Sequence, residues 1–111
     1  MSDQFAEITT FGETLVARIV SQSLRTESCV EGMDRVLTKF RSSDQRVLVL
    51  DFADVTYLSS TALGRMVALN RDIKAMGRKM QVCNLSDMLA EILVITGLDR
   101  VLDIDNFARC G

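Results

Sequence analysis

The sequence contains no histidine, proline or tryptophan among its 111 residues. Without histidine, the chain lacks the commonest general base and the commonest metal ligand. A hydrolase with a serine nucleophile would need another base, and no lysine lies in a motif that could supply one. The residue types therefore argue against an enzyme, and we expect no catalytic residues, no metal site and no cofactor.

An excess of one charge and long apolar runs are also missing. The 13 basic and 15 acidic residues are mixed along the chain and give a net charge of −2, so no basic stripe is available for nucleic acid. No apolar run approaches the roughly 20 residues of a membrane span, and the first ten residues do not resemble a signal peptide. Three scattered cysteines, Cys29, Cys83 and Cys110, indicate buried or incidental thiols in a reducing compartment. We expect a cytoplasmic protein that binds neither nucleic acid nor membrane.

The apolar residues that are present, 48% of the chain, suffice for one core, and we expect a single domain over residues 1–111. Residues 5–11 and 14–20 predict two strands of an antiparallel hairpin. Ser21–Arg25 is expected to be a polar connector. Apolar residues then recur at three- and four-residue steps from Val30 to Phe40, which predicts an amphipathic helix that begins near Thr26 or Ser28.

The centre of the chain predicts a buried strand followed by a second helix. Val47 to Leu50 is apolar at every position, as in a strand covered on both faces at the centre of a sheet. The helical pattern that follows begins after three hydroxyl residues and ends at Gly77. Residues 80–83 predict another strand.

The last part of the chain predicts a third helix, which Ser86 caps and Gly97 ends. Residues 101–104 predict a final short strand, and residues 105–111 a loose tail. The order of these elements predicts an α/β fold with a mixed sheet of four to five strands, an N-terminal hairpin and packed helices.

Three consecutive hydroxyl residues, Ser59, Ser60 and Thr61, precede the second helix. Serine and threonine are preferred helix caps, and one of the three is expected to accept a backbone N–H bond of the first turn. The same position suits a phosphate group, because a helix start presents free N–H groups and positive partial charge. The sequence alone leaves open which of these roles each hydroxyl has.

The segment LDFADVTYLSSTALGRMV, residues 50–67, resembles the segment that defines STAS domains, the family of bacterial anti-sigma factor antagonists. Leu50-Asp51 corresponds to the end of the family's strand, Tyr57-Leu58 to an apolar pair, and Leu63-Gly64 to the closing pair of the motif. The late segment from Ile95 to Ile104 is similar to the family's usual ending. The resemblance implies a STAS-like fold over nearly the whole chain.

The resemblance also implies a function in signalling and transcription regulation. In the family, the unphosphorylated antagonist binds a serine kinase that is also the anti-sigma factor, and phosphorylation of the motif's second serine releases it. That acceptor corresponds to Thr61 here, with Ser60 as the second candidate. Two positions differ from the motif, because Ser59 replaces an aspartate and Ala62 a glycine. These differences favour the alternative of a STAS adaptor or scaffold that is never phosphorylated.

Other features of the central stretch have simpler interpretations. Asp51 and Asp54 are expected to serve at a strand end and a turn, because no third metal ligand accompanies them. Gly64 within the helix indicates close packing, the approach of a partner, or a tolerated glycine. The expected partner-binding residues are Tyr57, Leu58, Ser59, Ser60, Thr61, Gly64 and Arg65.

Overall fold

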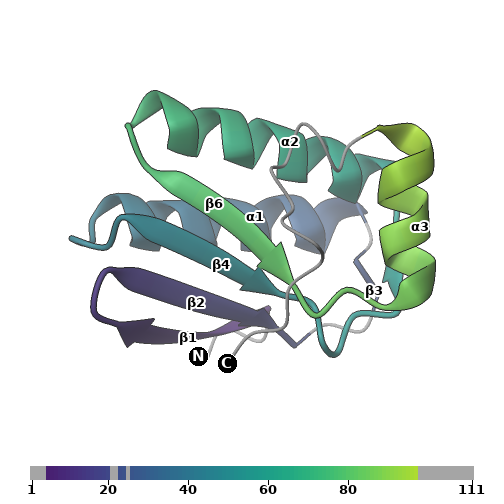
Figure 1. The fold of residues 1–111 in the computed structure, drawn as a ribbon, viewed down its shortest axis with the longest axis horizontal. Coiled ribbons are helices and arrows are strands. Elements are labelled where there is room, and N and C mark those ends of the chain that lie inside the picture. Colours follow the sequence, from purple (N-terminus) through teal and green to yellow (C-terminus); the bar gives the residue numbers. More distant parts are fainter. Residues whose placement is uncertain (1–4, 21–22, 25, 98–111) are drawn as a thin grey trace.

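The computed structural model describes residues 5–20, 23–24 and 26–97, which form a sheet with helices packed on it (Figure 1). In chain order the elements are β1 (Ala6–Phe11), β2 (Thr14–Ile19), β3 (Ser23–Leu24), α1 (Thr26–Arg41), β4 (Val47–Asp51), β5 (Tyr57–Leu58), α2 (Ser60–Ala75), β6 (Lys79–Cys83) and α3 (Asp87–Thr96). The predicted α/β fold is confirmed. The strand predicted at residues 101–104 and the tail at 105–111 lie outside the described residues.

The main sheet has the strand order β1-β2-β4-β6. The β1–β2 hairpin is antiparallel as predicted, whereas β4 pairs in parallel with both β2 and β6. The chain crosses from β2 to β4 and from β4 to β6 in the same direction along the sheet, and right-handed crossovers then place both helices on one face. Figure 1 shows α1 and α2 side by side behind the sheet, with α3 beyond the carboxyl ends of β4 and β6.

The register of the sheet explains where the core lies. Leu48 of β4 pairs with Leu15 and Met80, and Leu50 pairs with Ala17 and Val82. All six side chains are at most 2% exposed, since α1 and α2 cover this face. The helices contribute the buried residues Met33, Val36, Leu37, Phe40, Ala62, Met66, Leu69 and Ile73.

The predicted helix ends are confirmed where their signals are local. Ser86 caps α3 by accepting a bond from the N–H of Leu89, and Gly97 closes the helix at a φ of 76°. Gly77 follows Met76, the C-terminal cap of α2, at a φ of 74°, in the left-handed region that glycine adopts freely. α1 begins at Thr26, the earlier of its two expected starts.

Two expectations are wrong. Ser23–Leu24, expected to be part of a connector, forms β3 and pairs in parallel with β5. The sequence missed this strand because two residues form a strand only through a partner from elsewhere in the chain. Cys83, expected to be a buried or incidental thiol, is buried but disulfide-bonded. Sequence spacing does not show which cysteines approach each other in space.

Two helical glycines differ in their surroundings and give a test of packing. A Cβ at Gly32 of α1 would overlap the buried ring of Phe5, whereas a Cβ at Gly64 of α2 would meet open space. Both Gly→Ala changes gain the same helix propensity, so their difference isolates the overlap. We expect Gly32→Ala to be less stable than Gly64→Ala by about 1–3 kcal/mol in urea unfolding. Equal stabilities would contradict the packing of Phe5 on α1.

Candidate functional site

The candidate partner-binding residues lie together on β5 and the first turns of α2. We call this region the hydroxyl surface, and it consists of Tyr57, Leu58, Ser59, Ser60, Thr61, Gly64 and Arg65. Tyr57 is 52% exposed, and Ser60 and Gly64 are also exposed. Ser59, Thr61 and Arg65 are half-buried, and the side chain of Leu58 lies outside the described ones. The structure thus brings the seven positions into one region.

The loop that leads to the hydroxyl surface is held by Asp51 at the end of β4. One carboxylate oxygen, Oδ1, accepts bonds from the backbone N–H of Ala53 and from Nδ2 of Asn84, each at 3.0 Å. Asn84, which follows β6, has a φ of 57°, a left-handed conformation that asparagine tolerates better than most residues. Asp51 therefore has the expected strand-end role, and it ties the loop after β4 to the loop after β6.

Apolar burial and further backbone bonds fix the same loop. Phe52 and Val55 are at most 2% exposed. The N–H of Phe52 donates to the carbonyl of Cys83 at 3.0 Å, and the N–H of Val55 donates to the carbonyl of Phe52 at 3.0 Å. The loop is thus anchored before the chain reaches β5 and presents Tyr57 from a fixed base.

Asp54 has a different partner from Asp51. Its carboxylate pairs with Arg18 of β2, which also bonds Oε1 of Glu7 on β1 at 2.6 Å. The hydrogen bond with Glu7 raises the pKa of Arg18 above its usual value, so the guanidinium stays charged. The two aspartates serve separate structural roles, and the described residues contain no cluster of three or more potential metal ligands.

The small β3–β5 sheet is the part of the site that the sequence did not reveal. Ser23 pairs with Tyr57, and Leu24 pairs with Leu58. This pairing places the connector after β2 beside the hydroxyl surface. Neither strand has enough residues for alternation to be visible, so no sequence signal could have found the pair.

The structure assigns the helix cap to Ser59. Its hydroxyl accepts a bond from the N–H of Ala62 at 3.1 Å, and its carbonyl accepts the first helical bond, from Leu63, at 3.0 Å. Within the described part of the chain, the hydroxyls of Ser60 and Thr61 have no hydrogen-bond partner. The position where the STAS motif has a carboxylate is thus the cap, and the two phosphoacceptor candidates are left without a structural role.

Arg65 is oriented by a neighbouring helix. Its Nη2 pairs with Oδ1 of Asp34 on α1, and its side chain is 32% exposed. Gly64 beside it has open space around its Cα, which excludes the close-packing interpretation within the described structure. Near its start, α2 therefore has an exposed glycine, Gly64, next to an arginine, Arg65, that an ion pair orients.

α3 has exposed apolar residues in addition to its buried face. Met88, Val94 and Ile95 are 65%, 52% and 75% exposed, whereas Leu89 and Leu93 are at most 1% exposed. The face of Leu89, with Ile92 and Leu93 three and four residues later, is the one that the structure buries. None of the helices that the structure describes is both long and apolar enough to cross a membrane.

Solved structures share this arrangement of strands and helices. The protein TM1081 matches with a TM-score of 0.80 and 19% identity over 95% of this chain and 82% of that chain. The anti-sigma factor antagonist SpoIIAA in its unphosphorylated form matches with a TM-score of 0.70 and 16% identity, over 91% of this chain and 99% of that chain. At these identities the likeness establishes the fold.

The sequence adds the family to the fold. The STAS domain model matches residues 6–108, and the chain therefore belongs to the STAS domain family. It is 39% identical over 58 residues to the anti-sigma-B factor antagonist of Bacillus subtilis, over 52% of this chain and 53% of that relative. The alignment thus spans about half of the length of this curated relative. The resemblance seen in residues 50–67 is confirmed at the level of the family.

The different roles of Ser59 and Ser60 can be tested by stability. Ser59→Ala removes the cap of α2 and is expected to lower the free energy of unfolding by about 1 kcal/mol. Ser60→Ala removes an exposed hydroxyl without a partner and is expected to change it by less than about 0.5 kcal/mol. Urea unfolding of the two variants and the parent measures both values. A larger loss in Ser60→Ala than in Ser59→Ala would show that the cap is misassigned.

Proposed function

We propose that this protein is an anti-sigma factor antagonist, a non-enzymatic regulator that binds a kinase-type anti-sigma factor through the hydroxyl surface. Membership of the STAS family and the names of its relatives support this proposal. The main observation behind the proposal is that only one of the three hydroxyls at the start of α2 is used as the helix cap. Ser59 caps the helix, while Ser60 and Thr61 remain available beside the exposed Tyr57.

We further propose that phosphorylation of Thr61 or Ser60 switches binding off. A phosphate adds roughly −1.5 to −2 charges, which a helix start stabilises. The first turn of α2 contains no acidic residue to oppose it. Arg65 follows Thr61 by four residues, the spacing of neighbours on one helix face, so a phosphate on Thr61 would lie near a cation. SpoIIAA, which shares the fold, has also been solved in a phosphorylated form.

The same phosphate would oppose a docked partner. Tyr57 and Ser60 are exposed and offer an apolar ring and a small neutral hydroxyl. A dianion at this position would have to be stripped of water if the partner stayed in place, which costs several kcal/mol without a matching cation. The fold would persist, while the surface would change from neutral to anionic. This difference makes a switch that needs no catalytic group in the chain.

The phosphorylation step is tested with ATP and the cognate kinase-type anti-sigma factor. We expect mass spectrometry to find one phosphate on the parent protein, and either Thr61→Ala or Ser60→Ala to abolish it. Thr9→Ala, which removes an exposed threonine from β1, serves as the matched control and should leave it unchanged. A parent protein that binds the partner but takes no phosphate would instead support the alternative of a STAS adaptor that is not switched.

The binding surface is tested with a pair of exposed aromatic residues. Tyr57→Ala should weaken binding of the anti-sigma factor at least about tenfold, since aromatic anchors commonly contribute more than 1 kcal/mol. Phe11→Ala is the matched control, because Phe11 is 65% exposed on β1, away from the hydroxyl surface. Titration calorimetry measures both affinities. Equal affinities for the two variants would show that the interface does not include Tyr57.

A further inference from the structure

β1 forms one edge of the main sheet, and no strand of the described residues pairs with its outer side. The hydrogen-bond pattern shows which backbone groups face outward. The N–H of Val20 donates to the carbonyl of Phe5 at 2.9 Å, so residues at odd positions of β1 bond toward β2. The groups at even positions therefore point away from the sheet.

The outward-pointing backbone groups belong to Ala6, Ile8 and Thr10. The side chains of Ala6 and Ile8 face α1, because side chains alternate along a strand and both line the groove between β1 and this helix. A strand that bonds to these groups would direct every second side chain to the same face. The open edge and the groove thus form one continuous binding surface.

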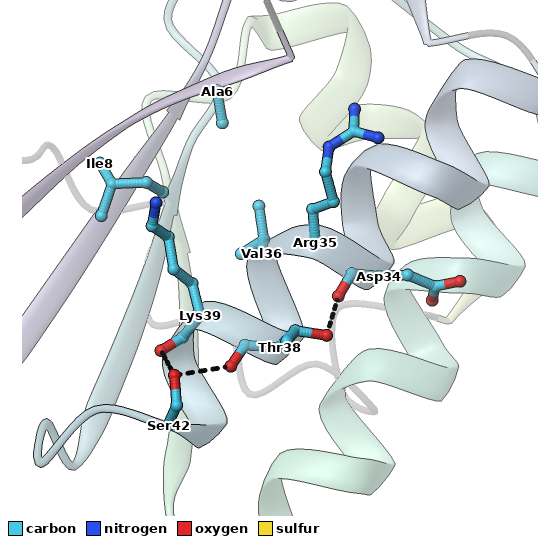
Figure 2. A pocket seen from close by; sticks show the side chains of 8 residues that line it. All are labelled: Ala6, Ile8, Asp34, Arg35, Val36, Thr38, Lys39 and Ser42. Atoms are coloured by element: carbon cyan, nitrogen blue, oxygen red, sulfur yellow. Dashed lines mark hydrogen bonds between the residues drawn. The ribbon is translucent and has the colours of Figure 1, made fainter. Parts of the chain in front are cut away.

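The groove has a volume of about 730 Å³. Figure 2 shows Ala6 and Ile8 on the strand side and Val36 on the helix side, which together make an apolar floor. Lys39 extends from α1 toward Ile8, and Arg35 extends from the preceding turn of the helix. The groove is therefore apolar at its base and cationic along its helical rim.

The remaining polar groups of the groove are already bonded. Asp34 points away from β1 and pairs with Arg65. The hydroxyl of Thr38 donates to the carbonyl of Asp34 at 2.9 Å, and that of Ser42 donates to helix carbonyls at 3.1 Å. Arg35 is already engaged, with Glu31 as one partner at 4.0 Å, and no carboxylate of the described residues pairs with Lys39. The charge left available to a ligand is therefore the positive charge of Lys39.

We propose that the outer edge of β1 binds an extended acidic segment of a partner protein, which adds to the sheet as a strand. Its backbone would bond to Ala6, Ile8 and Thr10. On the groove side it would place an apolar side chain over Ile8 and Val36 and acidic side chains two residues away in each direction, one of them near Lys39. Backbone bonds supply affinity in strand addition, and alternate side chains supply specificity.

Charge complementarity favours such a partner over a second copy of this chain. If β1 paired with β1 of another copy, only Ala6, Ile8 and Thr10 would face the two grooves, and none carries a negative charge. Glu7 lies on the opposite face, where it bonds Arg18. Pairing of two copies would therefore leave Lys39 without an anion.

The test uses two fluorescein-labelled peptides and fluorescence anisotropy. The peptide TETVTET places glutamate, valine and glutamate on one face, and TKTVTKT reverses both charges. We expect saturable binding of the acidic peptide to the full chain. The basic peptide should bind at least roughly tenfold more weakly than the acidic one. Equal binding of both peptides, or binding of neither, would overturn the proposal.

Two pairs of variants test separately the charge at the rim of the groove and the backbone bonds at the edge of β1. Lys39→Gln should weaken binding roughly three- to fivefold, whereas Lys79→Gln, on β6 at the other edge of the described sheet, should have no effect. Thr10→Pro removes an outward N–H and keeps the bonds to β2, and it should weaken binding roughly fivefold. Thr10→Ala keeps that N–H and should bind as the parent does.

The remaining results also test whether an acidic strand binds at the edge of β1. If Thr10→Pro does not fold, as circular dichroism would show, the lysine pair still tests the rim. Unchanged binding in Lys39→Gln would rule out the charge-based recognition. Sedimentation velocity of the parent provides the last check, because a dimer that Thr10→Pro disrupts would show that a second copy occupies the edge.

Discussion

The burial of β4 between two parallel strands is the constraint on which the rest of the structure depends. Its Leu48 and Leu50 are fully buried, and its backbone bonds to β2 on one side and β6 on the other. Parallel strands end at the same edge of a sheet, so the loops after β4 and β6 emerge next to each other. Asp51 joins these two loops through Asn84, and the chain can then reach β5 and the start of α2 at a defined place.

At the start of α2 the hydroxyl that caps the helix is separate from the two hydroxyls that follow it. Free N–H groups in a first turn need an acceptor, and Ser59 supplies one from outside the helix. The next two hydroxyls are thereby relieved of a structural role and lie where an added negative charge is compatible with the helix. A modification there would alter the surface with little cost to the fold.

The hydroxyl surface and the β1 groove lie on different elements but share an ion pair. Arg65 belongs to the first and Asp34 to the second, and their pairing joins α2 to α1. Because Asp34 is held by Arg65, its charge is directed away from the groove, whose rim keeps the charge of Lys39. The charge of the groove therefore depends on a contact between two helices that are far apart in the sequence.

Local patterns by themselves determined most elements of this protein. Alternation predicted the β1–β2 hairpin, an apolar run predicted the central β4, and Ser86, Gly77 and Gly97 marked helix ends that the structure confirms. The motif around Ser59 to Gly64 led to the correct family. These signals succeed because a strand, a cap or a turn is specified by residues within a few positions of one another.

Only the tertiary structure decided which surfaces those elements present. It selected Ser59 as the cap, paired β3 with β5, brought Phe5 against Gly32, and left Met88, Val94 and Ile95 of α3 exposed. It also joined Arg65 to Asp34 across 31 positions of sequence. Each of these outcomes depends on a partner that only the folded chain brings near, and no local pattern of residue types carries that information.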